Sequence, residues 1–315
     1  MSVVETTSLT RRFGPITALD AVTLDLPAGG VIGLVGPNGS GKSTLIRTLL
    51  GLIRATSGEA TVLGHPITEP RLFASDVGAL IESPAFIAGL SARANLTSLA
   101  HLHGTPLTRV DDVLHQVGLV GRDTEPVRRF SLGMKQRLGI AAALLTDPRL
   151  LILDEPTNGL DPAGIVEIRG LLRQLASDGR TVIVSSHLLS EVEVICDHLV
   201  IIRFGEILFA GPMQEMLART RAHIDIAVEH PEDVGRLAKA LATAGWQLAQ
   251  AGDSIRVEAG ADRAAELNRA ATATGVTLSR LIVTQDSLEE LYLEMTGRTD
   301  GELASARAAT DRKVA

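Results

Sequence analysis

Short, continuous apolar runs mark three positions in the first two thirds of the chain, at residues 31–35, 150–153 and 181–184. Segments with helical spacing flank each run, such as residues 42–50, which Gly51 closes. Short apolar runs that alternate with helices are typical of parallel strands buried on both faces. The pattern therefore predicts an α/β domain with a parallel sheet covered by helices.

Two other segments alternate between apolar and polar residues, at residues 22–26 and at residues 199–209, which bend around Phe204 and Gly205. Alternation with period two predicts antiparallel ribbons. Helical patterns dominate between about residues 71 and 148, at positions 92–103, 108–117 and 132–145. We expect a helical subdomain inserted into a sheet domain that spans residues 1–220.

The pattern restarts after residue 220. It predicts a small α+β domain at 221–297, with a strand at 223–228, a helix at 231–244, strands at 247–251 and 254–258, a helix at 261–274, a strand at 277–284 and a last helix at 287–295. This order fits a split βαβ, ferredoxin-like sandwich. Residues 298–315 are rich in Ala, Thr, Arg and Asp and are predicted to be a disordered tail.

Composition, charge and hydropathy reduce the number of function classes that fit this chain. A chain of 315 residues has room for two domains, and its net charge of −7 without a basic cluster argues against a nucleic-acid partner. No stretch approaches the roughly 20 apolar residues that cross a bilayer, and residues 1–9 lack a signal-peptide core. Cys196, the single cysteine, fits a small buried hydrophobe in a reduced, cytoplasmic compartment. Any membrane function would depend on another chain.

A glycine-rich loop follows the first apolar run and precedes a helix. It fits the Walker A pattern G-x-x-x-x-G-K-[ST] in the context that the pattern requires. Such a loop turns backbone N–H groups toward phosphates, while Lys42 reaches the β and γ oxygens and Ser43 offers a hydroxyl to Mg²⁺. The predicted ATP-binding residues are Gly36, Pro37, Asn38, Gly39, Ser40, Gly41, Lys42, Ser43 and Thr44.

Two carboxylates end the second apolar run, and a histidine follows the third. Parallel strands bind ligands at their carboxyl ends, so Asp154 is a candidate Mg²⁺ ligand and Glu155 a candidate general base for the attacking water. His187 emerges at the same sheet edge and can contact the γ-phosphate, although a lone histidine is more often a surface or core residue.

A second helix start also carries the features of an anion site. Ser131 is placed as the N-cap of the helix at 132–145, with Gly133 two residues further on. One loop already satisfies one triphosphate. Two phosphate-binding helix ends on one chain therefore suggest two chains that share two ATP molecules.

These motifs, in this order and spacing, resemble the ATP-binding cassette (ABC) family over residues 2 to about 220. The motifs are the phosphate loop, Ser131 to Arg137, Leu153 to Thr157, Asn158 to Pro162, and Ser186-His187. The resemblance implies an ATPase that works as a head-to-tail dimer, either a homodimer or a pair with another ATPase subunit. In that dimer Ser131 and Gly133 of one subunit close over the γ-phosphate held by the other.

The resemblance assigns further roles. Asp161 lies in the loop that carries signals between the two sites, and Phe13 matches the aromatic residue, usually a tyrosine, that stacks on adenine. The alternative for Phe13 is a ring in the core of the ribbon. A separate multi-helix transmembrane permease would hold the chain at the inner face of the cell membrane.

The chain departs from the family pattern at two places. Leu132 and Met134 replace a glycine and the glutamine of the signature loop. Glu82 stands where the family has a glutamine that touches Mg²⁺ and the water, so Glu82 is both a candidate metal ligand and a candidate catalytic residue, or else a solvated loop carboxylate. In these features the chain resembles members of the subfamily that exports bacitracin, lantibiotics and related drugs.

Three functions compete for this sequence. The first is an ATPase that drives export of a drug, peptide antibiotic or lipid-like molecule through a permease. The second is a non-transport ABC ATPase that acts on ribosomes or DNA; such proteins commonly carry two cassettes or a long coiled coil, and this chain has neither. A P-loop kinase or GTPase does not explain Ser131, Gly133 and His187. We expect the first.

Overall fold

The structure is a computed structural model that describes residues 2–81, 85–251 and 254–296. Glu82 and the tail at 298–315 lie outside these residues, so what the sequence suggests about them stays a prediction. Contacts divide the chain into two compact units, Met1–Gln214 and Glu215–Ala315, which are described separately.

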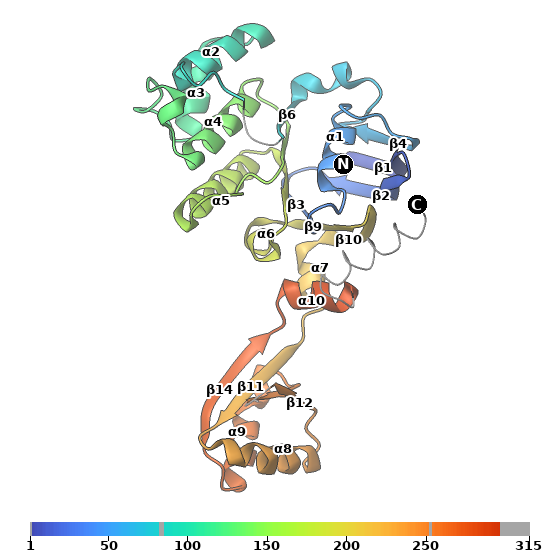
Figure 1. The fold of residues 1–315 in the computed structure, drawn as a ribbon, viewed down its shortest axis with the longest axis vertical. Helices are drawn as coiled ribbons and strands as arrows, with labels where there is room; N and C mark the ends of the chain where they lie inside the picture. The colour runs from blue at the N-terminus through green and yellow to red at the C-terminus, as the bar shows by residue number, and fades with distance from the viewer. Residues whose placement is uncertain (1, 82–84, 252–253, 297–315) are drawn as a thin grey trace. The chain divides into compact units, whose positions relative to one another are not determined.

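A six-stranded sheet forms the centre of the first unit (Figure 1), with the strand order β10-β9-β3-β8-β7-β6. The strands from β9 to β6 run parallel to one another. Their bounds are β3 Gly30–Val35, β6 Val77–Leu80, β7 Leu150–Leu153, β8 Thr181–Ser186, β9 His198–Arg203 and β10 Glu206–Pro212. The predicted parallel sheet is confirmed.

The antiparallel ribbon predicted at residues 199–209 is confirmed. β9 and β10 form an antiparallel hairpin, and β9 also pairs in parallel with β3. Four consecutive residues of β9, Leu199 to Ile202, are buried, as expected for a strand inside a covered sheet. The hairpin therefore extends the central sheet at its edge.

A second, antiparallel sheet begins the chain and has the order β2-β1-β4-β5. It contains the predicted N-terminal ribbon, whose strands are longer than the alternating segment suggested. The bounds are β1 Ser2–Phe13, β2 Ile16–Pro27, β4 Ser57–Val62 and β5 His65–Pro66.

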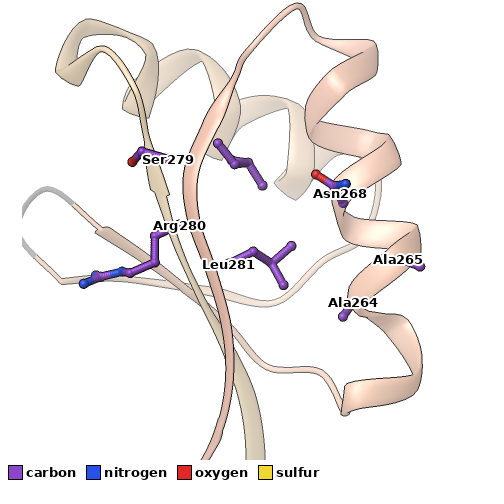
Figure 2. A pocket seen from close by; sticks show the side chains of 7 residues that line it. Ala264, Ala265, Asn268, Ser279, Arg280 and Leu281 are labelled. Carbon is purple, nitrogen blue, oxygen red and sulfur yellow. The ribbon is translucent and has the colours of Figure 1, made fainter.

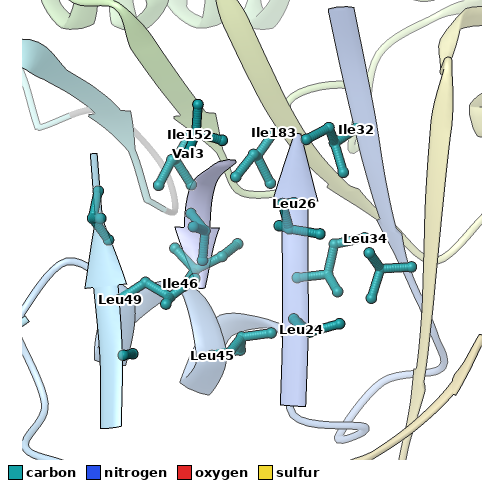
Figure 3. Close-up of a cluster of buried hydrophobic side chains, with 14 of the residues drawn as sticks. Val3, Leu24, Leu26, Ile32, Leu34, Leu45, Ile46, Leu49, Ile152 and Ile183 are labelled. Atoms are coloured by element: carbon teal, nitrogen blue, oxygen red, sulfur yellow. The ribbon is translucent and has the colours of Figure 1, made fainter. Parts of the chain in front are cut away.

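Helix α1 (Lys42–Leu49) is anchored in a hydrophobic core cluster of this unit (Figure 3). Leu45, Ile46 and Leu49 pack with side chains from both sheets, including Leu24 of β2 and Ile183 of β8. Removing a buried leucine such as Leu45 costs about 2–5 kcal/mol. The core therefore holds the start of α1, which follows the glycine-rich loop, in a fixed position.

The helical subdomain lies in the middle of the chain and contains α2 (Ala92–His103), α3 (Thr108–Gln116) and α4 (Leu132–Leu144), each within one residue of its prediction. α4 packs against β6 and so joins the subdomain to the sheet. The other helices of the chain's first 217 residues are α5 Pro162–Ser177, α6 Leu189–Ile195 and α7 Met213–Leu217, with 3₁₀ turns at Pro70–Leu72, Ala74–Asp76 and Val127–Arg129.

The second unit has a four-stranded antiparallel sheet with the order β12-β13-β11-β14. Its elements follow one another as β11 Ala222–Val228, a 3₁₀ turn Pro231–Asp233, α8 Val234–Thr243, β12 Leu248–Ala251, β13 Ser254–Val257, a 3₁₀ turn Ala261–Arg263, α9 Ala264–Ala273, β14 Leu278–Gln285 and α10 Leu288–Thr296. Apolar side chains of α8 and α9, such as Leu237 and Leu267, pack on Ile224 and Ile226 of β11. Across the described residues, we find no helix with the length and hydropathy that a membrane span requires.

Candidate nucleotide site

The glycine-rich loop connects β3 to α1 and lines a cavity of about 380 Å³. Gly39 and Gly41 have φ angles of 79° and 112°, which residues with side chains rarely adopt. A Cβ on Gly36 would lie 2.1 Å from the carbonyl oxygen of Ile202, so this glycine is required by packing. The lining residues are Ala18, Asn38, Gly39, Ser40, Gly41, Lys42, Ser43, Thr44, Glu155, Asn158 and His187. A cavity of this size beside a helix N-terminus can hold a polyphosphate.

Lys42 places its ammonium group inside the loop. Its Nζ donates to the carbonyl oxygens of Gly36 at 2.7 Å and Pro37 at 3.2 Å, and lies 3.6 Å from Oε1 of Glu155. Burial lowers the pKa of Lys42, and the carboxylates of Glu155 and Asp154 partly offset this effect. A phosphate anion in the loop would stabilise the charged form further.

The two carboxylates after β7 are held by a serine on the next strand. The Ser185 hydroxyl donates to Oδ1 of Asp154 at 2.6 Å and accepts the backbone N–H of Glu155 at 2.8 Å. Glu155 has a φ angle of +51°, an unusual backbone conformation for a residue with a side chain. Ser185 thus fixes both the metal-ligand candidate and the general-base candidate, a role that the sequence analysis missed.

His187 and Glu155 meet above the loop. Nδ1 of His187 lies 2.7 Å from Oε2 of Glu155, while the other oxygen of Glu155 faces Lys42. The His187 side chain is 36% exposed and Glu155 is 21% exposed, so both can reach a ligand in the cavity. The structure therefore brings Lys42, Glu155 and His187, which come from three separate motifs, into one cluster.

A buried hydrogen-bond network behind this cluster was also missed by the sequence analysis. Glu191 of α6 is 7% exposed, and its Oε2 accepts the hydroxyl of Thr157 at 2.6 Å. The Ser186 hydroxyl lies 3.5 Å from the same oxygen. Thr157 follows Glu155 by two residues and Ser186 precedes His187, so Glu191 links the chain segments that carry both.

Seven of the predicted residues that the structure describes lie outside the cavity lining: Phe13, Gly36, Pro37, Ser131, Gly133, Asp154 and Asp161. Ser131 caps α4, where its hydroxyl accepts the N–H of Met134 at 3.3 Å, and Asp161 caps α5 by accepting the N–H of Gly164 at 2.9 Å. Phe13 is 43% exposed at the end of β1, so it is not a core residue of the ribbon. Gly133 lies in the first turn of α4.

Among the described residues of its own chain, none gives Gly133 a packing reason to be a glycine. A Cβ added there would meet only Leu160 Cδ2, at an ordinary contact distance of 3.8 Å. The φ angle of Gly133 is not positive either. Space at the start of α4 is therefore left open toward a ligand or another molecule.

The fold and the cluster together define a P-loop nucleoside triphosphatase, with a cavity beside the loop, a lysine in the loop and a carboxylate 3.6 Å from that lysine. The family model described as ABC transporter matches residues 19–158. The chain is 37% identical over 300 residues to the bacitracin transport ATP-binding protein BcrA of Bacillus licheniformis, covering 94% of this chain and 98% of that protein. The chain belongs to the ABC transporter ATP-binding protein family, and it is an ATPase.

Other relatives and solved structures agree. The lantibiotic transport ATP-binding protein SrtF of Streptococcus pyogenes is 43% identical over 201 residues, which are 64% of this chain and 87% of that protein. The structure of cbiO1 from Clostridium perfringens, described as part of the ABC transporter complex cbiONQ, has a TM-score of 0.64 at 28% identity and covers 69% of this chain and 91% of its own. The ADP conformation of MJ1267, an ATP-binding cassette of an ABC transporter, has a TM-score of 0.63 at 25% identity, over 70% of this chain and 96% of its own. The predicted family, fold class and ATPase activity are confirmed.

Proposed function

We propose that this chain is the motor subunit of an exporter, and that it drives a separate multi-helix permease that moves a drug, a peptide antibiotic or a lipid-like molecule. The relatives named for bacitracin and lantibiotic transport support this cargo class. The relative cbiO1, described as part of a complex, supports a separate partner. In this proposal the permease holds the chain at the inner face of the cell membrane.

The observation that carries the catalytic part is the cluster of Lys42, Glu155 and His187 around one cavity. In the proposed reaction Lys42 binds the β and γ oxygens, Glu155 accepts a proton from the attacking water, and His187 orients Glu155 and the γ-phosphate. Because Glu155 already contacts both other groups, it is positioned to respond when ATP enters.

We infer that Mg²⁺ binds with the nucleotide. Ser43 lines the cavity and carries a hydroxyl, and Asp154 provides a carboxylate that Ser185 orients. Mg²⁺ is usually held by one or two protein oxygens together with phosphates and water, so these two groups suffice when ATP is bound. Glu82 is proposed as a further ligand on the ground of the family resemblance.

We also propose that two chains complete each site, with Ser131 and Gly133 of one chain contacting the γ-phosphate bound by the other. The support is the capped start of α4 and the absence of any packing requirement for a glycine at position 133 within the described chain. Asp161 would lie near the same junction, and the exposed ring of Phe13 would stack on adenine.

Mixing two inactive variants tests the shared site. Ser131→Arg should keep ATP binding and lose hydrolysis, while Lys42→Ala should lose ATP binding. In a mixed dimer, one site combines the intact phosphate loop of the Ser131→Arg chain with the intact Ser131 of the Lys42→Ala chain. That site can turn over, whereas the other site is broken on both sides.

Random pairing of equal amounts makes half of the dimers mixed, each with one working site. Mixing should therefore recover up to about a quarter of the wild-type rate. No recovery at any mixing ratio contradicts the shared site.

Purification from detergent-solubilised membranes tests the partner. A tagged chain carrying Glu155→Gln should bring down an integral protein of several helices in the presence of Mg-ATP. Recovery of ribosomes or DNA with no membrane protein would favour the non-transport ATPase instead.

A further inference from the structure

Among the described residues, no further strand pairs with the outer side of β14 (Leu278–Gln285), which forms one edge of the sheet in the second unit. β14 has eight residues, whereas the opposite edge strand β12 has four. Proteins commonly protect edge strands by keeping them short or by placing lysine or proline in them. β14 has neither residue type, its single charged residue is Arg280, and its apolar side chains Ile282 and Val283 are 47% and 38% exposed.

The backbone of β14 offers hydrogen-bonding groups on its outer side. The N–H of Asp286 donates to the carbonyl oxygen of Arg221 at 3.0 Å, and the register pairs Ile282 with Asp225. In an antiparallel ladder, hydrogen-bonded pairs alternate with non-hydrogen-bonded pairs. Residues 280, 282 and 284 therefore point their N–H and C=O groups toward β11, while Leu281 and Val283 point theirs away from the sheet.

A groove runs between β14 and α9 (Figure 2). Its volume is about 370 Å³, and its walls include Ala264, Ala265 and Asn268 of α9 and Leu281 of β14. Leu281 points toward α9, whereas Arg280 points to the other side of the sheet. The small residues leave room for an apolar side chain beside the edge strand.

We propose that β14 pairs with β14 of a second copy of this chain, antiparallel and with the two-fold axis at Ile282, to form one eight-stranded sheet. This interface is separate from the nucleotide-dependent contact proposed above, and it forms without nucleotide. It goes beyond the ATPase function because it would keep two chains together throughout the ATP cycle.

The register follows from the side chains. With the axis at Ile282, each Leu281 lies opposite Val283 of the other copy, and Ile282 lies opposite itself, so apolar residues meet apolar residues. The outward N–H and C=O groups of Leu281 and Val283 then face one another and can form four hydrogen bonds. Val283 of each copy enters the groove beside α9 of the other. An axis at Arg280 would instead place two like charges face to face.

Charge complementarity also favours this register. Arg280 is exposed, and no ion pair of the described residues includes it. In the proposed sheet it lies opposite Thr284 of the second copy, whose hydroxyl lies 3.3 Å from Oδ2 of Asp225. Asp286 follows two residues along the same face. Each Arg280 would therefore approach the carboxylates of Asp225 and Asp286 on the other copy, which within their own chain contact Arg256 at 3.1 Å and His223 at 3.3 Å, respectively.

Light scattering on the full-length, nucleotide-free protein tests the proposal. The wild type should be dimeric at micromolar concentration, and Val283→Lys should raise the apparent dimer Kd by about tenfold or more, since the substitution occurs twice per interface. Leu102→Lys is the matched control, because Leu102 is an apolar residue of α2 that is 82% exposed. It should leave the Kd unchanged.

A cysteine at the axis gives a second test that does not depend on weakening the interface. Ile282 would sit in a non-hydrogen-bonded pair with itself, at a Cα separation of about 4.5 Å that a disulfide can span. In a Cys196→Ala background, Ile282→Cys should form a disulfide-linked dimer under mild oxidation, and Leu102→Cys should not.

A monomeric wild type without nucleotide, or cross-linking of Ile282→Cys no faster than that of Leu102→Cys, overturns the proposal. If this interface is lost but ATPase activity is intact, the proposed catalytic function still stands. If the Lys42 variants lose ATPase activity but remain dimeric without nucleotide, the proposed interface still stands.

Discussion

The central sheet of the first unit and the sheet of the second unit differ in how they are enclosed. In the first unit, every residue of β7 and β8 is buried, so polar side chains gather where the strands end, at Asp154, Glu155 and His187. In the second unit, residues 224, 226 and 228 of β11 are buried and residues 225 and 227 half-buried, while β14 is largely exposed. A sheet covered on both faces thus concentrates chemistry at the strand ends, whereas an open sheet offers its backbone and its edge to a partner.

The largest expected effect on ATP binding and turnover comes from a substitution in the loop that follows a strand of the covered sheet. Lys42→Met removes the charge in the loop but keeps most of the side-chain volume, so ATP binding should weaken and turnover should fall at least ~100-fold. Steady-state ATPase assays and nucleotide titration measure both. Unchanged nucleotide affinity would contradict the assigned role of Lys42.

A smaller effect should follow from the buried network behind the cluster. Thr157→Val removes the hydroxyl that Glu191 accepts at 2.6 Å, which should let Glu155 and His187 shift and lower kcat roughly 10- to 100-fold while the ATP Kd stays within about twofold. Thr157→Ser keeps a hydroxyl and should restore kcat.

The control for that prediction is Thr6→Val. Thr6 is a buried threonine of β1 whose hydroxyl donates to the carbonyl oxygen of Val22 at 2.9 Å. Its loss should reduce stability without changing kcat. If Thr157→Val and Thr6→Val behave alike, the Glu191 network has a structural role alone.

The pH dependence of the free energy of unfolding should also report the burial of Lys42. Because burial lowers the pKa of Lys42 below its unfolded value, the unfolded state binds more protons between the two pKa values. The wild type should therefore gain free energy of unfolding relative to Lys42→Met as pH rises through that window, and show no such gain below the folded pKa. Denaturant titrations at pH 7 and pH 10 measure this difference. Lys239→Met, which changes a lysine of α8, is the control.

The smallest effect on catalysis should come from the open sheet. Val283→Lys in β14 should leave the basal ATPase rate within about twofold of the wild type, since the substitution lies outside the residues that line the nucleotide cavity. A large loss of ATPase activity would show that the two sheets do not divide these tasks.

The sequence was most informative where a local pattern determines the structure. The phosphate loop requires glycines with positive φ angles, and strand ends place Asp154 and His187 at one edge of the sheet. The helix bounds in the helical subdomain followed from spacing and, for α4, from the capping residue Ser131.

The sequence was least informative where contacts between distant positions in the chain determine the structure. Alternation predicted the β9–β10 hairpin but not that β9 joins the central sheet. Ser185 and Asp154 are 31 positions apart, and Thr157 and Glu191 are 34 apart, so no local pattern pairs them. The positive φ angle of Glu155 likewise depends on its surroundings rather than on residue type.

The central claim is that Glu155 activates the attacking water but is not required for ATP binding. Glu155→Gln keeps the shape of the side chain and removes the base, so it tests this claim most directly. Single-turnover measurements with radiolabelled ATP should show normal binding and hydrolysis slowed by about 10²- to 10⁴-fold. Hydrolysis at the wild-type rate in this variant would contradict the account.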